Sequence, residues 1–336
     1  MMQTNPAKAS SWVFRPLLTG KLLVWALLAI LVLAWSGKAT QMDRALALTG
    51  QAIGVGVTGK GDSQVANGFG QIARSLWPLQ LETRTPIAQI EHFRADRLPP
   101  FSRVEHRKST TQSHDPSTGK YVKTTQSASE LVVPYGYVVT VLGKLIETLQ
   151  IALWGTILSL LISIPLGFFG ARNLMGDGIV VAAARTFVSF FRAVPELVSA
   201  LFLVVAYGFG PIAGVIALGL HGAGFLGKFF ADDSENADPK PQEALRALGA
   251  NRLKLARYAV LPQVMPQFTA YTLYILDRNI RMATVIGLVG AGGIGQELKG
   301  RFDLYAYGHV ATILIAIFLM VLLIDQLSVK LRRKLL

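Results

Sequence analysis

Long runs of apolar residues without a single charge recur along this chain, and they constrain its fold more than any other feature. Glu147 and Arg172 bound a charge-free run of 24 residues, and the 31 residues from Leu197 to Gly227 also carry no charge. About 20 such residues cross the hydrocarbon core of a bilayer as one helix. Only 16% of the 336 residues are charged, whereas soluble domains carry roughly 25%. The sequence therefore predicts an all-α polytopic membrane protein.

We expect about six spans, because polar loops and turn residues interrupt the apolar sequence. Gly208-Phe209-Gly210-Pro211, for example, divides one apolar run between two helices joined by a tight turn. The basic residues Lys8, Arg15 and Lys21 allow the first run to be a signal peptide instead, although Leu17 and Leu18 lengthen it enough to span. The expected spans cover residues 21–36, 145–170, 186–209, 211–231, 264–289 and 308–328.

The net charge of +13 would suggest a nucleic-acid partner in a soluble protein. Here the Lys and Arg residues lie in short loops between apolar runs, where they mark the cytoplasmic side. The N-terminus (1–20), the 171–192 loop, the 232–262 loop and the C-terminal tail are all basic. Six spans place all four on one side. We therefore expect both termini in the cytoplasm and no nucleic-acid partner.

The polar segment 37–134 then lies outside the membrane. Residues 64–81 have the pattern of an amphipathic helix that lies on the membrane surface. The sequence from Ser102 to Ser127 predicts a hairpin around the turn Asp115-Pro116-Ser117-Thr118-Gly119. We expect this segment to be an external insertion between the first two spans, before the permease-like core 135–336.

Two glycine-rich segments imitate nucleotide-binding motifs. Gly290, Gly292 and Gly295 fit G-x-G-x-x-G, but a dinucleotide site needs a helix next and an acidic residue about 20 positions on. We expect the chain to run into the last apolar span instead, and residue 315 is Ile. The second segment, Gly54–Gly61, lacks the Ser/Thr that meets Mg²⁺ and lies in the external segment. The chain is therefore expected to hold no nucleotide, cofactor or metal and to have no catalytic residues.

The loop between the fourth and fifth expected spans carries the most specific pattern. It contains Glu243-Ala244-Leu245-Arg246-Ala247-Leu248-Gly249 and, after eleven residues, Leu261-Pro262. Spacing alone predicts two short amphipathic helices broken by Gly249. The pattern resembles the EAA loop of ATP-binding-cassette (ABC) importer permeases, with Leu245 in place of the second Ala. In that family the loop docks into a cleft on the ATPase subunit, so the resemblance makes Glu243, Ala244, Leu245, Gly249, Leu261 and Pro262 coupling residues.

Five further segments resemble the phosphonate-type branch of these permeases. They are Phe191–Glu196, Gly208–Val215, Glu235–Pro239, Leu261–Pro266 and Val289–Gly295. The resemblance implies a type I ABC importer permease in a bacterial inner membrane that carries phosphonate, phosphite or hypophosphite. It also implies a homodimer, two ATPase subunits that bind ATP and Mg, and a periplasmic or lipid-anchored substrate-binding protein.

Other functions stay open at this point. A related permease would carry another small anion or solute such as phosphate. A membrane anchor that displays residues 37–134 would need no transport, but it gives no reason for the Glu243–Pro262 pattern. A membrane-bound NAD enzyme would need Gly290–Gly295 on the cytoplasmic side.

Charged residues inside the expected spans have two interpretations. Charges at such depths are costly and face a partner or a water-filled path. In one interpretation Glu196 or Asp277 pairs with Arg278 or Arg281 and fixes helix packing. In the other, Arg281 and Asn279 face the path and lower the barrier for an anion. His221 is a packing residue or a path residue, and Gly290, Gly292, Gly293 and Gly295 form a close-packed or flexible segment at the outer end and are candidates for an outer gate.

Overall fold

The computed structural model describes residues 20–58, 62–90, 98–114 and 121–335. The chain forms two compact units, which divide between Arg74 and Ser75. The first unit contains α1 (Gly20–Ala39), α2 (Met42–Thr58) and most of α3 (Gln64–Leu76). The helix expected over residues 64–81 is thus confirmed as far as Leu76. It ends there because Pro78 disfavours a helical conformation at Trp77.

A three-stranded antiparallel sheet begins the second unit and corrects the all-α prediction. β1 (Thr83–Pro86) and β2 (Arg103–His114) both pair with β3 (Tyr121–Val133), in the order β1-β3-β2. Arg103 pairs with Val132 and His114 with Tyr121, so β2 and β3 form the expected hairpin. The turn residues 115–120 lie outside the described residues. Strands form here because the segment is rich in Thr and Val and is too polar to lie in a bilayer.

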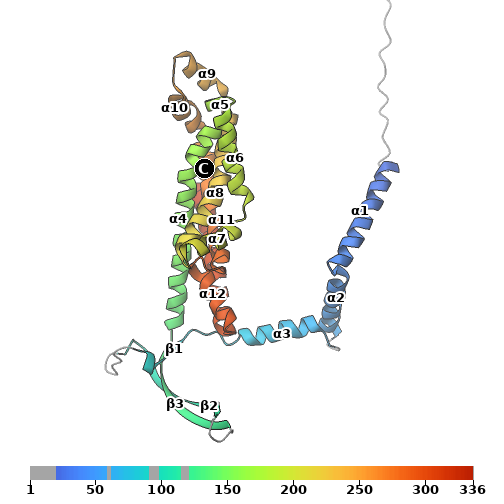
Figure 1. The fold of residues 1–336 in the computed structure, drawn as a ribbon, viewed down its shortest axis with the longest axis vertical. Helices are drawn as coiled ribbons and strands as arrows, with labels where there is room; N and C mark the ends of the chain where they lie inside the picture. The colour runs from blue at the N-terminus through green and yellow to red at the C-terminus, as the bar shows by residue number, and fades with distance from the viewer. Residues whose placement is uncertain (1–19, 59–61, 91–97, 115–120, 336) are drawn as a thin grey trace, which may run out of the picture. The chain divides into compact units, whose positions relative to one another are not determined.

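Helices make up the rest of the second unit (Figure 1). The long ones are α4 (Gly136–Gly170), α8 (Pro211–Asn236), α11 (Leu261–Gly287) and α13 (Tyr307–Leu335). They correspond to the runs expected at 145–170, 211–231, 264–289 and 308–328, and α4 begins nine residues earlier than expected. The shorter ones are α5 (Arg172–Met175), α6 (Ile179–Ala193), α7 (Glu196–Tyr207), α9 (Pro239–Ala247), α10 (Arg252–Leu255) and α12 (Gly293–Asp303), with a 3-10 turn η1 (Ile87–Gln89) and a π-helical turn η2 (Ala256–Val260).

The span expected at 186–209 is not one straight helix. Two helices, α6 and α7, replace it and meet at an angle of 88°. Val194 has an extended backbone between them, with φ −83° and ψ 117°. The physical reason is Pro195, which excludes the helical conformation from the preceding residue. The residues on both sides of this break are mostly apolar, so composition alone did not reveal it.

Among the described residues, three helices are long and apolar enough to cross a membrane, within Gly136–Gly170, Pro211–Asn236 and Tyr307–Lys330. The bent pairs α1–α2 and α6–α7 raise this number to five if each pair is one span. The described helix α11 is long enough to cross a membrane but not apolar enough, because Asp277, Arg278 and Arg281 lower its hydropathy. The structure thus supports a multi-pass membrane protein, and the number six stays a prediction.

Close contact between α4 and α8 forms the centre of the second unit. The Ser159 hydroxyl on α4 contacts the carbonyl oxygens of Gly155 (2.8 Å), in its own helix, and of Gly219 (3.0 Å), on α8. A Cβ atom added at Gly167 would lie only 2.7 Å from the Cβ of Phe230. Small residues therefore let the two backbones approach, as is common between membrane helices.

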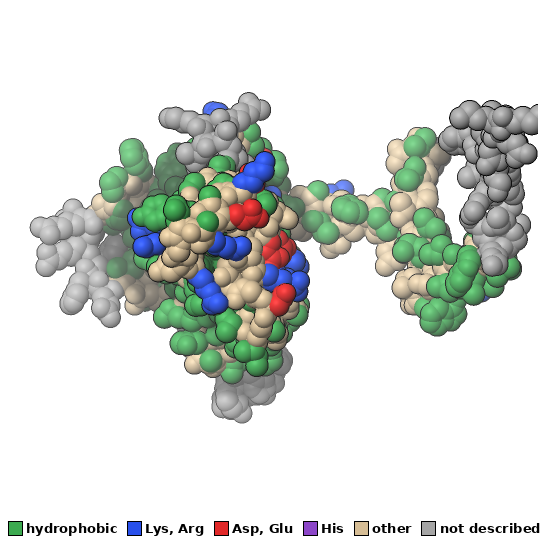
Figure 2. Space-filling view, turned by 90° about the horizontal axis from the view of Figure 1, so that it is seen from above, with side chains coloured by type: hydrophobic (Ala, Val, Ile, Leu, Met, Phe, Trp, Pro, Cys, Tyr) green, Lys and Arg blue, Asp and Glu red, His purple; other side chains and the backbone are tan. Residues whose placement is uncertain are grey.

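The two ends of this helix bundle differ in character. The helices α9 and α10 lie at one end, and the sheet and α12 lie toward the other (Figure 1). The view onto the α9–α10 end shows Lys, Arg, Asp and Glu side chains gathered there (Figure 2). At the other end, the Gln80 backbone accepts a hydrogen bond of 2.8 Å from the Thr312 hydroxyl, which ties the segment before β1 to α13.

We predict that Gly167→Val destabilises the protein, because the added methyl groups must displace Phe230 or separate α4 from α8. Overpacking a well-packed core typically costs about 1–3 kcal/mol. Thermal unfolding of the detergent-solubilised chain measures the effect. Gly143→Val is the matched control, because Gly143 is exposed on the same helix and has no neighbour within 4 Å of an added Cβ. Equal transition temperatures for both variants would contradict the close contact at Gly167.

Candidate functional site

The loop between α8 and α11 folds into two short helices, as its sequence predicts. The Asp238 side chain accepts a hydrogen bond from the Lys240 backbone and begins α9. Gly249 then adopts φ +76°, which L side chains rarely adopt, and turns the chain. The Asn251 side chain accepts from the Lys254 backbone and begins α10. The chain remains helical from α10 through η2 into α11, and Pro262 lies in the first turn of α11.

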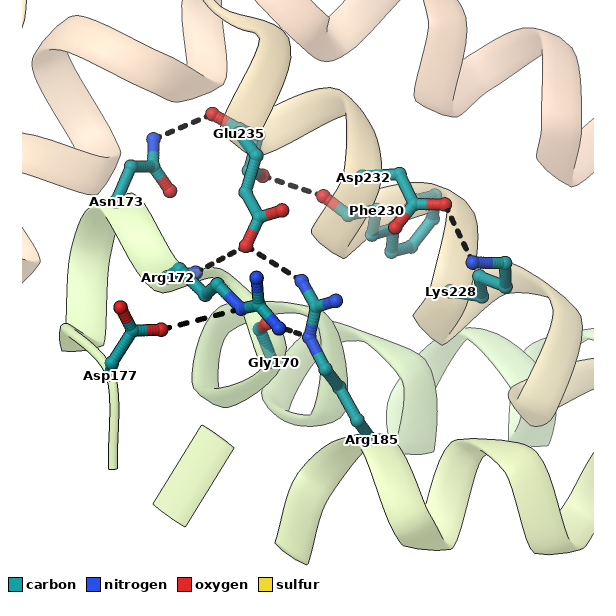
Figure 3. Close-up of polar contacts among 10 residues, drawn as sticks. Gly170, Arg172, Asn173, Asp177, Arg185, Lys228, Phe230, Asp232 and Glu235 are labelled. Carbon is teal, nitrogen blue, oxygen red and sulfur yellow. Dashed lines mark hydrogen bonds and ion pairs between the residues drawn. The ribbon is translucent and has the colours of Figure 1, made fainter. Parts of the chain in front are cut away.

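Hydrogen bonds fix this loop to its own bundle. The Asn173 amide on α5 donates to the Ser234 carbonyl (2.6 Å) and to the Gln242 side chain (3.1 Å). Arg246 donates to the Asn173 carbonyl at 2.5 Å. The Glu235 carboxylate accepts from the Arg172 backbone and from the Arg185 guanidinium, both at 2.6 Å (Figure 3). The helices α5, α6, α8 and α9 therefore meet in one polar network.

A small apolar cluster lies beneath the loop. Leu245 is partly buried against it, while Glu243, Ala244 and Gly249 are exposed. Its buried members are Ala171, Leu174, Ala237, Leu255, Ala259, Val260 and Val264. On the outer side, Leu248, Leu253 and Tyr258 expose 81%, 69% and 65% of their surface. Exposed apolar side chains on a rigid support are typical of a protein-binding surface.

Glu196, His221 and Arg278 come together between three helices. Glu196 begins α7, His221 lies on α8 and Arg278 lies on α11. The Glu196 carboxylate lies 2.7 Å from Arg278 Nη2 and 3.1 Å from His221 Nε2. His221 Nδ1 donates to the Val194 carbonyl at 3.0 Å, directly at the α6–α7 bend. This ion pair was one of the two interpretations of the sequence.

The other charged candidates lie apart from this cluster. Asp277 is buried and pairs with Arg281 one turn away on the same helix, and the Arg281 side chain is 49% exposed. Asn279 is fully buried, and its amide donates to the Thr156 hydroxyl on α4 at 3.0 Å. Asn279 thus contributes to the packing of α11 on α4, and Arg281 is the most exposed of the predicted path residues.

The glycine segment after α11 is closely packed. Gly290, Gly292 and Gly293 have positive φ, and Gly290 through Gly295 are buried. The Gly293 backbone donates to Glu147 at 3.0 Å, and the Ile294 backbone donates to Thr148 at 2.8 Å, so α4 caps the first turn of α12. The helix α12 corrects the expectation that the chain runs directly into the last span. The segment before the glycines is the helix α11, so the strand that a dinucleotide site requires is replaced by a helix.

The second glycine-rich motif is also helical where it is described. Gly54–Thr58 belongs to α2, and residues 59–61 lie outside the described residues. Within the described parts of the chain, no three His, Asp or Glu side chains gather as metal ligands. Sequence reasoning missed four residues that hold the loop, namely Asn173, Arg185, Glu235 and Gln242. All four lie in segments that the sequence marked as basic loops, 171–192 and 232–262, but only Glu235 also lies in a segment that carries the family resemblance, Glu235–Pro239.

We predict that Glu196→Gln lowers thermal stability more than the double variant Glu196→Gln/Arg278→Gln does. The single change leaves the Arg278 charge without its carboxylate, and breaking a buried pair costs more than replacing both partners. Thermal unfolding of the detergent-solubilised chain measures both variants. Glu243→Gln, on the exposed face of α9, is the control and is expected to unfold like the parent. Additive effects of the two substitutions would mean that the pair does not couple α7 to α11.

Comparison with known proteins assigns this architecture. Residues 163–335 match the family described as binding-protein-dependent transport system inner membrane component. The putative phosphite transport system permease protein HtxE of Stutzerimonas stutzeri is 52% identical over 260 residues, which cover 77% of this chain and 100% of that protein. The phosphite transport system permease protein PtxC of Stutzerimonas stutzeri is 44% identical over 189 residues, covering 56% of this chain and 69% of that protein.

A solved structure shares the fold. A chain of the inward-facing MetNI methionine ABC transporter is similar with a TM-score of 0.50 and 22% identity, covering 58% of this chain and 96% of its own length. Residues 163–335, which match the family model, include the bent pair α6–α7, the α9–α10 loop and the cluster of Glu196, His221 and Arg278. The chain therefore belongs to the family of inner-membrane components of binding-protein-dependent transport systems.

Proposed function

We propose that this chain is the permease subunit of an ATP-driven importer for a phosphorus oxyanion such as phosphite or phosphonate. The observation that carries the proposal is the α9–α10 loop, which presents exposed apolar side chains on a rigid support in a protein of this transport family. The two relatives named above are described as phosphite transport permeases and support the substrate class. An importer for another small anion such as phosphate is the alternative.

The partners follow from this function. Two copies of the chain enclose the path, and two ATPase subunits bind ATP and Mg²⁺ and dock on the α9–α10 loops. A substrate-binding protein delivers the anion from the other side. The basic loops and termini then face the cytoplasm of a bacterium, and the sheet of β1, β2 and β3 lies outside. This chain hydrolyses no ATP itself.

Coupling would proceed through the polar network beneath the loop. Movement of α9 reaches α5 through Asn173 and reaches α6 and α8 through Glu235. Arg278 and Arg281 lower the barrier for the anion in the path. The packed Gly290–Gly295 segment would form the outer gate, because it contacts both α4 and the turn before α8.

We predict that Gly249→Val abolishes most co-purification of the ATPase subunit while the permease still inserts in the membrane. Valine at φ +76° costs roughly 1–2 kcal/mol in the left-handed conformation, so the turn between α9 and α10 changes shape. Gly208→Val is the matched control. Gly208 also has a positive φ, is exposed and has no neighbour within 4 Å, but it lies at the other end of α8. Equal ATPase recovery in both variants would argue against docking at this turn.

The substrate class is tested with the complete complex in lipid. We expect ATP hydrolysis to rise on adding loaded binding protein with phosphite, hypophosphite, methylphosphonate or 2-aminoethylphosphonate, and not with sulfate. Stimulation by phosphate alone would favour the alternative substrate. A complex that assembles and hydrolyses ATP but responds to none of these anions would contradict the substrate proposal. A variant that lacks most of residues 82–133 tests the membrane-anchor alternative. If this variant still takes up the anion, the chain does more than anchor the external segment 37–134 to the membrane.

A further inference from the structure

A polar cavity lies between α6 and α8, outside the cluster around Glu196. Its volume of about 130 Å³ is roughly ten times what a single water molecule needs. Three of its ten lining residues are basic, namely Arg185, Arg192 and Lys228, and one, Asp232, is acidic. The others are Ser189 and the small or apolar residues Leu166, Gly170, Val188, Gly227 and Ala231. Such a cavity has room for a small oxyanion with a few non-hydrogen atoms.

The charges around this cavity do not cancel. Arg185 pairs with Glu235 at 2.6 Å, and Lys228 pairs with Asp232 at 2.9 Å (Figure 3). Arg192 has no carboxylate within 4 Å among the described residues, and its buried Nε has no hydrogen-bond partner there. An unpaired guanidinium between membrane helices is costly. Arg192 is thus the cation whose counter-ion is absent from the described chain.

The backbone places Arg192, which is partly buried, against the middle of α8. Arg192 lies in the last turn of α6, two turns after Arg185 on the same face, which corresponds to about 10 Å. It packs against Gly224, where an added Cβ would meet the Arg192 backbone nitrogen at 2.9 Å. Gly224 is near the middle of the 26-residue helix α8. Arg185 is neutralised by Glu235, and the uncompensated charge of Arg192 therefore lies nearer the centre of the bundle.

A second arginine approaches the same place. The Cζ atoms of Arg192 and Arg278 lie 5.1 Å and 5.2 Å from the centroid of the Phe225 ring. Arg278 Nη2 bonds Glu196, but its buried Nη1 has no partner among the described residues. The guanidinium groups of Arg192 and Arg278 thus both lie near the Phe225 ring, and each has one buried N–H group without an acceptor among the described residues. Guanidinium groups bind phosphorus oxyanions strongly, because their planar N–H groups match the oxyanion geometry.

We propose that the cavity between α6 and α8 binds a phosphorus oxyanion, with Arg192 as its principal ligand. Arg185 and Lys228 are already paired with Glu235 and Asp232, so the net positive charge of the lining comes from Arg192. Arg278 lies beside Arg192 and has a free Nη1 among the described residues. The proposal deepens the proposed function and rests on it for the identity of the anion. A free oxyanion and the phosphate of an anionic lipid share the required chemistry, so the experiment separates these two sources.

Binding is measured on the full chain in nanodiscs of zwitterionic phosphatidylcholine, with inorganic phosphite as the probe. Calorimetric titration at constant ionic strength is expected to show saturable binding to the parent protein. Arg192→Gln is expected to weaken it at least tenfold, and Arg192→Lys, which keeps the charge, is expected to weaken it less. Arg257→Gln is the matched control, because it removes an exposed arginine of the 232–262 loop away from the cavity.

The lipid source is tested in nanodiscs that contain phosphatidylglycerol. If a lipid phosphate occupies the cavity, the parent retains phosphatidylglycerol that Arg192→Gln loses, as native mass spectrometry would show. If a free anion occupies it, lipid retention is equal and only phosphite binding differs. Either result supports an oxyanion site. Unchanged phosphite binding and unchanged lipid retention in Arg192→Gln, or binding of neither probe by the parent, would overturn the proposal.

A measurement on the unmodified sequence guards against variants that do not fold. Phenylglyoxal modifies accessible arginines, and phosphite is expected to slow modification of Arg192 but not of Arg257. Equal rates with and without phosphite would also overturn the proposal. Failure of the transport proposal and failure of the oxyanion site give different results. If phosphite binds at Arg192 but does not stimulate ATP hydrolysis by the complex, the proposed transport fails and the site stands. If phosphite binding, lipid retention and stimulation are all equal in parent and Arg192→Gln, transport stands and the site falls.

Discussion

The buried carboxylate of Glu196 connects three helices, and the geometry of the bundle depends on it. It lies 2.7 Å from Arg278 on α11 and 3.1 Å from His221 on α8, while it begins α7 immediately after the bend. Attraction between opposite charges is strong where water is excluded. The same contact holds the bend in place, because His221 also donates to the Val194 carbonyl. Without this carboxylate, Arg278 would lie among the helices with no acidic partner.

The position of α6 follows from that bend. Because α6 ends where α7 begins, its last turn lies against the middle of α8, at Gly224. Arg185 and Arg192 therefore both lie against α8, Arg185 at Glu235 near its end and Arg192 at Gly224 near its middle. Glu235 then holds the first of these arginines and the start of α5 together. One network thus links the α9–α10 loop to the helices that carry the unpaired arginine.

Several elements were predictable because a single physical property determines each of them. Charge-free runs of about 20 residues must be helical in a membrane, since every backbone polar group needs an internal partner there. Gly249 was predictable as a turn because its neighbours form amphipathic segments on both sides. The hairpin of β2 and β3 was predictable from its central turn signal. The break at Pro195 was missed because the apolar sequence continues across it, and β1 was missed because four residues carry too little pattern.

The amino-acid sequence by itself determined the class of this protein. Apolar length requires membrane helices, and the pattern from Glu243 to Pro262 predicts two short helices broken at Gly249, because both depend on residues near one another in the chain. Only the tertiary structure decided which charges are neutralised. Glu196 and Arg278 are 82 positions apart, and residue spacing does not specify such a pairing. Whether a buried charge has a partner depends on how helices pack, and this packing is why Arg278 has a carboxylate beside it and Arg192 has none among the residues that the structure describes.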